Sequence, residues 1–506
     1  MSRLAVAVAV ACFASIAAAC GSDGGGNGTA DGAAPDTDAD GDASGELDAA
    51  PPVPGFRAEY FSRYRTLVAS AVETSIDHTW GDAEPVAGAG TDRFSARFTG
   101  TLDVPAAGSY RFATRADDGV RLWVGDQLVI DNWIPHFVER HEGTVDLAAG
   151  PVAIRVEYFE INLAAELHLY WTPPGGTETL LDAAHVTTTP GADAGPKPPY
   201  TNPVYPTDCP DPGVMSVADT GGAPPTYYAV CTGGSFRIRR SYDLVLWEDT
   251  GAAILPAGKP PWAANGGRNW APEIHAVGNK FIAYYTSVNG ANVLSIGAAS
   301  ADAPTGPYTD RGSPLVEHPD GVIDATFVRD AAGVPYLVYK IDGNAHGRPT
   351  PILIRRLAAD GLSFAPGSTE TELLRNAPAT WEGGVVEAPW IIERGGTYFL
   401  FYSGNVYDHR YRTGVARATS ITGPYTKLGN PILGNDADWV GPGHGSVVPA
   451  GDRLYFAFHA WHENGAGQHD STRGRVILVD EIDFVDGWPR INDGTPSSGL
   501  EPWPVE

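Results

Sequence analysis

Basic side chains are scarce in this sequence. Its 506 residues include 34 Lys and Arg against 61 Asp and Glu, which gives a formal net charge of −27. Nucleic-acid binding needs clusters of Lys and Arg that neutralise phosphates, and the sequence holds no such cluster. We therefore expect no nucleic-acid partner, whereas a neutral or weakly charged ligand suits an acidic surface.

Cysteine is also rare. The chain has 4 Cys, and only Cys209 and Cys231 lie beyond the first 20 residues. In an exported protein this pair either forms a disulfide or remains two buried thiols, and the spacing alone does not decide between them. Neither residue is accompanied by a second Cys/His pair at metal-ligand spacing, which argues against a zinc site.

Long apolar runs are missing except at the N-terminus. Arg3 precedes an apolar run over residues 4–18 that is too short to span a bilayer, and small residues lead to Cys20. This pattern predicts an export signal over residues 1–20. The small residues before Cys20 resemble the lipobox of bacterial lipoproteins, which implies lipidation of Cys20 and a location at the cell envelope, on the outer membrane or cell surface. Ordinary signal cleavage beside an incidental Cys is the alternative. We expect membrane contact only through this anchor.

Large apolar residues are almost absent from residues 21–54, which are rich in Gly, Ala and Asp. Such a segment cannot bury a core, so we expect a disordered acidic linker. Residues 55–189 contain short runs of alternating polarity, such as 110–114 and 120–124, separated by turns. This pattern is typical of an antiparallel β-sandwich. Residues 190–199 predict a second, Pro-rich linker.

Residues 200–506 repeat one strand design. Aromatic strands that follow Gly-containing turns fall at 280–285, 335–339, 397–402 and 453–458, and 227–230 fits as a first member. Their spacing of about 55 to 62 residues matches the blades of a propeller. We therefore predict an all-β chain in which a five-bladed β-propeller follows the β-sandwich.

One ionisable residue precedes each aromatic strand of the repeat. These residues would lie on the innermost strands, facing the axis: Asp211, Glu273, Asp324, Glu387 and His444. An ionisable residue between apolar neighbours is costly unless it faces a wet cavity. Glycosidases need two carboxylates across a sugar, one protonated and one ionised. The alternative is that some of these residues only satisfy buried backbone or cap turns.

These motifs resemble those of glycoside hydrolase family 43 over roughly residues 200–495. The resemblance implies that Asp211, in Pro210-Asp211-Pro212, is the general base that activates water. It implies that Glu387, in Val386-Glu387-Ala388-Pro389, is the general acid. Asp324, in Ile323-Asp324-Ala325-Thr326, would orient that acid and tune its pKa. No cofactor is required for this chemistry.

The resemblance further implies an inverting hydrolase of arabinose- or xylose-containing plant polysaccharides. We expect a monomeric, exo-acting α-L-arabinofuranosidase or β-xylosidase that takes an oligo- or polysaccharide substrate. An endo-1,5-α-L-arabinanase is the alternative within the family. A non-catalytic glycan-binding protein of the cell surface is the alternative of another class. The three carboxylate motifs favour catalysis, because binding alone does not need them.

Further residues of the repeat are candidates for substrate binding. Trp270-Ala271-Pro272-Glu273 and Gly443-His444 match the remaining axial motifs of the family, and Trp390 and Tyr402 are further candidate sugar platforms. Packing is the alternative for each aromatic residue. In arabinanase-like members the residue matching His444 helps to hold a central cation, which makes Ca²⁺ or Na⁺ possible at the axis. A purely structural histidine is the alternative.

Lys340, Asp342 and Asn344 form a polar cluster after a predicted strand. They lie at the rim of the pocket or form a turn, and Asp-Gly-Asn suits a tight turn as well.

The predicted sandwich resembles the protective antigen 14 domain, a carbohydrate-binding module. The resemblance rests on the segments 57–61 and 116–126. In sugar-binding members a pair of Asp residues holds Ca²⁺ that contacts sugar hydroxyls, and Asp117 and Asp118 match that pair by position. The alternative is that Asp118 and Gly119 only form a turn.

Overall fold

The computed structural model describes residues 51–64, 66–190, 199–218, 225–264 and 268–505. Cys20, residues 21–50 of the first expected linker and residues 191–198 of the second lie outside the described residues. Almost every described element is a strand, and the one helix is the short 3₁₀ turn η1 (Gly343–His346). No helix in the described part of the chain is long and apolar enough to cross a membrane.

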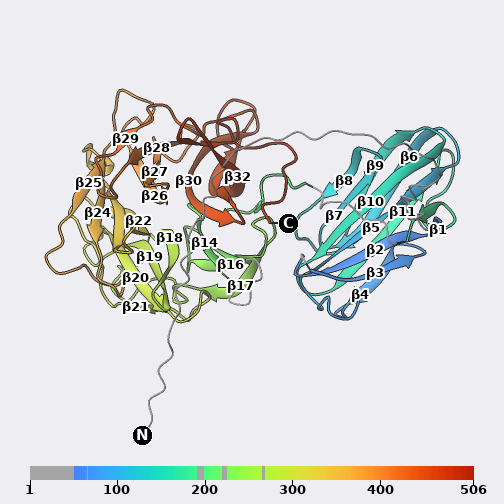
Figure 1. Ribbon diagram of the computed structural model, residues 1–506, viewed down its shortest axis with the longest axis horizontal. Coiled ribbons are helices and arrows are strands. Elements are labelled where there is room, and N and C mark those ends of the chain that lie inside the picture. The colour runs from blue at the N-terminus through green and yellow to red at the C-terminus, as the bar shows by residue number, and fades with distance from the viewer. Residues whose placement is uncertain (1–50, 65, 191–198, 219–224, 265–267, 506) are drawn as a thin grey trace, which may run out of the picture. The chain divides into compact units, whose positions relative to one another are not determined.

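Strands β1–β13 form two antiparallel sheets (Figure 1). The larger sheet has eight strands: β1 (Val53–Pro54), β2 (Phe56–Ser62), β3 (Thr66–Glu73), β5 (Phe94–Val104), β7 (Val120–Val124), β8 (Gln127–Asn132), β10 (Gly150–Glu160) and β13 (Val186–Thr188). The smaller has five strands: β4 (Asp77–Gly81), β6 (Gly108–Asp117), β9 (Glu139–Leu147), β11 (Ala165–Thr172) and β12 (Thr179–Leu180).

Buried and exposed side chains alternate along these strands, which explains how the two sheets enclose a core. In β6, Tyr110 and Phe112 are buried and Arg111 between them is exposed. Successive side chains of a strand point to opposite faces, so one face of each sheet is apolar and must be covered. The predicted β-sandwich is confirmed.

Strands β14–β33 form five four-stranded antiparallel sheets in the described part of the chain, one after another along the sequence (Figure 1). The first comprises β14 (Gly213–Val217), β15 (Thr226–Val230), β16 (Arg237–Ser241) and β17 (Trp247–Ala253); the second β18 (Trp270–Val277), β19 (Lys280–Val288), β20 (Leu294–Ala301) and β21 (Thr309–Asp310); the third β22 (Val322–Arg329), β23 (Pro335–Ile341), β24 (Ile352–Arg356) and β25 (Thr371–Leu374); the fourth β26 (Val386–Arg394), β27 (Thr397–Gly404), β28 (Arg412–Ala418) and β29 (Thr426–Lys427); the last β30 (Trp439–Ala450), β31 (Arg453–His462), β32 (Arg475–Val485) and β33 (Trp488–Ile491).

The first strand of each sheet contacts the first strand of the next, and β14 contacts β30, which closes the ring. The architecture is a β-propeller, and the aromatic strands of the sequence repeat are the second strands, β15, β19, β23, β27 and β31. Nearly every residue of β27 is buried. A strand covered on both faces by neighbouring sheets has no solvent side, so its sequence is a continuous apolar run.

The start of the propeller is fixed along its last sheet. Tyr200 and Glu501 exchange backbone hydrogen bonds of 2.8 and 2.7 Å. The buried Asn202 side chain donates to Asp480 Oδ1 at 3.0 Å and to Ser497 Oγ at 2.8 Å. The chain that follows these anchors runs to Asp211, just before β14.

Candidate active site

A cavity of about 260 Å³ lies where the first strands of the five sheets meet. Its lining comes from or next to the first strand of every sheet, together with the second strand β23, the third strand β32 and loops: Asp211, Thr232, Trp270, Ile323, Asp324, Lys340, Asp342, Asn344, Val385, Glu387, Val406, Tyr407, His444 and Arg475. The structure therefore brings together Asp211, Trp270, Asp324, Glu387 and His444, which the sequence pattern singled out. The cluster of Lys340, Asp342 and Asn344 also lines this cavity.

A break in strand register aims these side chains at the cavity. The pairing of the first with the second strand shifts in the second to fifth sheets. At this level each sheet places one non-glycine residue at positive φ: Asp211 (53°), Ala271 (41°), Asp324 (57°), Ala388 (54°) and His444 (47°). A left-handed conformation at a residue with a side chain costs roughly 1–3 kcal/mol and is held by the surrounding structure. Each sheet therefore has one strained position at the level of the cavity.

The five equivalent positions are not used alike. In three sheets the residue at positive φ lines the cavity itself: Asp211, Asp324 and His444. In the other two sheets this residue is Ala271 or Ala388, and the residue before it, Trp270 or Glu387, lines the cavity. Glu273, which the sequence motif grouped with the acids, lies two residues beyond the break and is not among the lining residues. Its Oε2 lies 2.6 Å from His275 Nε2 instead. The structure therefore does not bring Glu273 to the cavity, because the register shift comes before it.

Asp211 is surrounded by groups that favour its carboxylate form. Arg475 Nη1 donates to Oδ1 at 2.7 Å, Thr232 Oγ1 donates to Oδ2 at 2.6 Å, and His444 Nδ1 lies 3.3 Å from Oδ1. Burial opposes ionisation, but Arg475, His444 and Thr232 outweigh it and hold the pKa of Asp211 well below its usual range. Asp211 is therefore ionised, as a general base must be.

His459 lies beside Asp211 as a neutral imidazole. Burial, followed by the charge of Arg475, lowers the pKa of His459 well below its usual value. Its Nδ1 accepts a hydrogen bond of 3.1 Å from the Asp211 backbone N–H, which requires that nitrogen to be unprotonated. His459 therefore orients the backbone of Asp211 without adding charge.

Glu387 is held by a cation and a phenol. Lys340 Nζ lies 2.9 Å from Glu387 Oε2 and 2.9 Å from Asp342 Oδ1. The Tyr411 hydroxyl donates to Glu387 Oε1 at 2.8 Å. Burial and the charge of Glu387 raise the pKa of Tyr411 well above its usual value, so the phenol stays protonated and donates. Both oxygens of Glu387 are thus fixed in direction.

Asp324 is linked to Glu387 through the backbone. The N–H of Ala388, the residue after Glu387, donates to Asp324 Oδ2 at 2.9 Å. Burial raises the pKa of Asp324 to about 7, and the charge of Glu387 acts in the same direction, whereas His444 and Lys340 oppose the rise. Asp324 therefore keeps its proton up to about neutral pH, next to the backbone that follows Glu387.

The family model for glycosyl hydrolases family 43 matches residues 200–489, which is more than half of the chain. The chain belongs to this family. A β-D-galactofuranosidase of Aspergillus niger is 29% identical over 314 residues, which cover 59% of this chain and 84% of that protein. An extracellular exo-α-(1→5)-L-arabinofuranosidase of Cellvibrio japonicus is 24% identical over 53% of this chain and 83% of that protein. The crystal structure of a thermostable family-43 glycoside hydrolase superposes with a TM-score of 0.52 at 28% identity, covering 60% of this chain and 99% of that one.

The PA14 domain model matches residues 52–184, so the sandwich is a PA14 domain. An anti-sigma-I factor of Acetivibrio thermocellus is 32% identical over 138 residues, which cover 26% of this chain. The chain spans about a fifth of that relative (21%).

Two of the expected sugar platforms of the family-43 domain lie away from the cavity. Trp390 packs beside His275, with 5.7 Å between the ring centroids. Tyr402 is buried, stacks on Trp381 and donates to Glu382 Oε1 at 2.7 Å. Their aromatic rings pack between sheets, which was the alternative for both. Of the three aromatic candidates, only Trp270 lines the cavity.

The contacts of Arg475, Thr232, Lys340 and Tyr411 with the acids carried no sequence signal. Arg475 is 264 positions from Asp211 in the chain, and Tyr411 is 24 positions from Glu387. None of them lies on a first strand, which is where the sequence repeat places its candidate site residues. Thr232 and Tyr411 come from loops of the same sheet as the acid that each contacts. Arg475 comes from the last sheet to Asp211 at the first, and Lys340 from the sheet before that of Glu387.

The PA14 domain carries a second polar cluster. Oxygens of Asp117, Asp118 and Glu160 lie within 4.8 Å of one another, and in the described residues no other group of three comes this close with metal-ligand geometry. Burial, together with repulsion among these carboxylates, raises the pKa of Asp118 to about 6 and that of Glu160 to about 9. Glu160 is fully buried, and its Oε1 has no hydrogen-bond partner.

Backbone N–H groups orient this cluster. The N–H groups of His136 and Ile161 donate to the two oxygens of Asp118 at 2.8 and 2.9 Å. Carboxylate oxygens are the ligands that Ca²⁺ prefers, and a cation would neutralise the charge that burial disfavours. The donor set therefore fits Ca²⁺. Glu160 was not recognised in the sequence because it lies 43 positions from Asp117, at the end of an apolar strand.

Proposed function

We propose that the protein is an inverting, exo-acting α-L-arabinofuranosidase or β-xylosidase of plant polysaccharides, with Asp211 as general base and Glu387 as general acid. The observation that carries the proposal is the meeting of Asp211, held ionised by Arg475, with Glu387 and the protonated Asp324 around one cavity. A base and an acid whose surroundings push their pKa values apart are what glycoside hydrolysis requires.

Each carboxyl group has one task in this reaction. Asp211 accepts a proton from water while the water oxygen attacks the anomeric carbon. Glu387 donates a proton to the leaving oxygen as the glycosidic bond breaks. Asp324 accepts a hydrogen bond from the backbone N–H that follows Glu387, and the charge of Glu387 raises the pKa of Asp324. Attack by water on the face opposite the leaving group inverts the anomeric centre, provided that the two carboxyl groups are roughly 6.5–9.5 Å apart.

The proposed substrate is a terminal pentosyl unit. A cavity of about 260 Å³ is smaller than the 300–1,000 Å³ typical of drug-sized ligands, so it suits a single sugar better than a chain. Two relatives are a β-D-galactofuranosidase and an α-L-arabinofuranosidase, which favours an arabinofuranoside. An endo-arabinanase is the alternative.

A substrate panel tests this proposal. Aryl α-L-arabinofuranosides, aryl β-xylosides, aryl β-D-galactofuranosides and linear arabinan are offered to the full-length enzyme, and the first product is followed by NMR. We expect release of single arabinose or xylose units in the inverted configuration. Oligosaccharides as first products from arabinan would show endo action, and retained configuration would contradict the assignment of Asp211 as base.

We further propose that the PA14 domain binds glycans through Ca²⁺ held by Asp117, Asp118 and Glu160. When bound, the cation would supply ligand positions for sugar hydroxyls. The buried Oε1 of Glu160 without a hydrogen-bond partner supports this assignment. The protein would be exported as a monomer and tethered through a lipid on Cys20, so that the two domains act at the cell surface. Cell fractionation of a Cys20→Ala variant tests the tether.

A further inference from the structure

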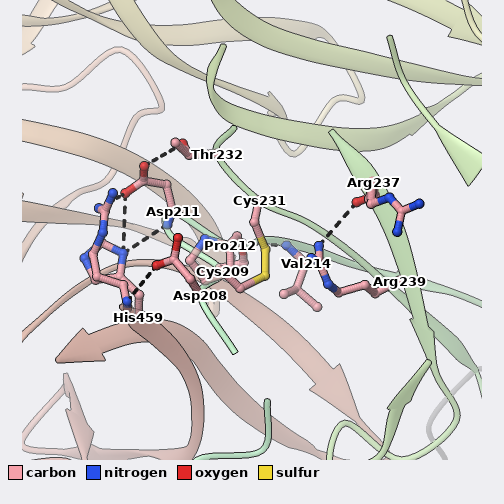
Figure 2. The surroundings of a disulfide bond; sticks show 12 residues. Asp208, Cys209, Asp211, Pro212, Val214, Cys231, Thr232, Arg237, Arg239 and His459 are labelled. Carbon is pink, nitrogen blue, oxygen red and sulfur yellow. Dashed lines mark hydrogen bonds and ion pairs between the residues drawn. A yellow bond between two sulfur atoms is a disulfide. The ribbon is translucent and has the colours of Figure 1, made fainter. Parts of the chain in front are cut away.

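The only two cysteines of the described residues form a disulfide beside the proposed base (Figure 2). Cys209 and Cys231 have Cα atoms 5.2 Å apart and close a loop of 22 positions. Cys209 lies two residues before Asp211, and Cys231 directly precedes Thr232. The covalent bond therefore joins the two segments that carry a carboxylate and its hydroxyl donor.

The segment that carries Asp211 has few backbone bonds of its own. In Cys209-Pro210-Asp211-Pro212 the two prolines have no N–H to donate. The Cys209 N–H donates to the Arg475 carbonyl at 2.7 Å, and the Asp211 N–H donates to His459 Nδ1 at 3.1 Å. Asp211 also has a φ of 53°, which a side-chain-bearing residue keeps only under constraint. A strand ladder does not hold this segment in place.

Thr232 can give its hydroxyl proton only to Asp211. Its Oγ1 accepts the Ala271 N–H at 2.8 Å and lies 2.6 Å from Asp211 Oδ2. A hydroxyl has one proton, so the direction of both bonds is fixed. The Thr232 N–H donates to the Pro210 carbonyl at 2.8 Å, which ties the two segments a second time.

The disulfide connects both arms that hold the carboxylate. Through Cys231 it fixes Thr232, which binds Oδ2. Through Cys209 it fixes the chain that binds the Arg475 backbone, and the Arg475 side chain binds Oδ1 at 2.7 Å. Cys209 is fully buried and Cys231 almost so, so the bond is shielded from solvent reductants.

We propose that the Cys209–Cys231 disulfide and Thr232 form a clamp that positions the Asp211 carboxylate for attack by water. Both are positioning residues, since neither takes part in bond making. The clamp sets turnover and not substrate affinity. This inference rests on the proposed role of Asp211 as base.

A double-mutant cycle tests the clamp. The full-length wild type is compared with Cys209→Ala/Cys231→Ala, with Thr232→Val and with the triple variant on an aryl glycoside that the wild type cleaves. We expect kcat to fall by roughly 5- to 100-fold in each of the first two, because misplacement of a reacting group by a fraction of an ångström is costly. KM should stay within about twofold. The triple variant should be no slower than the slower of the two, since both changes remove one constraint.

Matched controls separate positioning from stability. Thr232→Ser keeps the hydroxyl and should restore most of kcat. Thr250→Val removes a hydroxyl that donates at 2.6 Å to the Ile238 carbonyl of the same sheet, and should leave kcat unchanged. If the cysteine variant does not fold, the comparison of Thr232→Val with Thr232→Ser decides, because both keep the disulfide.

Several outcomes would overturn the clamp. The first is free thiols at Cys209 and Cys231 in denatured, unreduced enzyme. The second is an unchanged kcat in Thr232→Val or in the folded cysteine variant. The third is a loss of kcat in the triple variant that equals the product of the two separate losses. Asp211→Asn separates the two proposals. If that variant is active, the base assignment fails. If it is inactive while the clamp variants match the wild type, the clamp alone fails.

Discussion

Lys340 Nζ lies 2.9 Å from Glu387 Oε2, and its side chain is only 1% exposed. This buried ammonium beside the proposed acid Glu387 lowers the pKa of Asp324, which burial raises. Burial and a fixed cation therefore act in opposite directions on the protonation of Asp324. Their balance sets the pH up to which Asp324 stays protonated.

Replacing the cation should move the basic limb of the pH profile. In Lys340→Met the pKa of Asp324 rises above about 7, so Asp324 stays protonated to higher pH. The basic limb of kcat/KM, which depends on that proton, therefore shifts upward. Lys340→Arg keeps the charge and is the control. The measurement is kcat/KM from about pH 4 to 10. A basic limb that stays in place or moves to lower pH would show that Lys340 does not act on the acid.

The opposite limb should respond to Arg475. The pKa of Asp211 lies below its usual range, so the base is ionised across the ordinary pH range and activity falls only in strong acid. Arg475→Met removes the cation that opposes the effect of burial on Asp211, so the pKa of Asp211 rises. The acidic limb of kcat/KM therefore moves to higher pH. Arg473→Met, two residues earlier, removes a cation that does not line the cavity and serves as the control. An unmoved acidic limb in Arg475→Met would contradict the assignment.

Glu273 and Trp270 test the register break. Glu273→Gln should keep kcat and KM within about threefold, because Glu273 contacts His275 and not the cavity. Trp270→Ala should raise KM by about tenfold, because an aromatic wall of the cavity is lost. Steady-state kinetics on one aryl glycoside measure both. A large loss of activity in Glu273→Gln would show that Glu273 is a substrate-binding residue after all.

The fold, and the meeting of Asp211, Asp324 and Glu387 at one cavity, could be predicted because their signals are local. Alternating strands, a spaced aromatic repeat and acids between apolar neighbours are each visible within a few residues. The same repeat misplaced Glu273, because a one-residue shift of register turns a side chain to the other face. Trp390 and Tyr402 could not be told from packing residues, since a strand buried between two sheets is aromatic on both faces.

The partners of the acids could not be predicted for a different reason. Arg475 meets Asp211 only where the last sheet closes on the first, and Lys340 meets Glu387 only across two neighbouring sheets. No spacing along the chain encodes these contacts. Likewise the disulfide and two free thiols were equally consistent with the spacing of Cys209 and Cys231. The Pro-flanked segment at Asp211 explains the need for a link only once its hydrogen bonds are known.

The PA14 cluster predicts stabilisation by Ca²⁺. When free Ca²⁺ exceeds its Kd by about a hundredfold, the unfolding temperature of the full-length protein should rise by about 5 °C. Glu160→Gln should abolish this response, because one charged ligand is replaced by a neutral isostere. Asp146→Asn changes an exposed acid of β9 and is the control. An equal rise in Glu160→Gln would show that Ca²⁺ binds elsewhere.

The central claim is that Glu387 protonates the leaving group and Asp211 activates water. The most direct test compares Glu387→Gln and Asp211→Asn on two aryl glycosides of the same sugar, one with a good and one with a poor leaving group. We predict that Glu387→Gln loses about 10² to 10⁴-fold in kcat on the poor leaving group and far less on the good one, because a good leaving group needs no proton. Asp211→Asn should lose a similar factor on both. Equal losses for Glu387→Gln on the two substrates, or over half the activity kept by Asp211→Asn, would contradict the account.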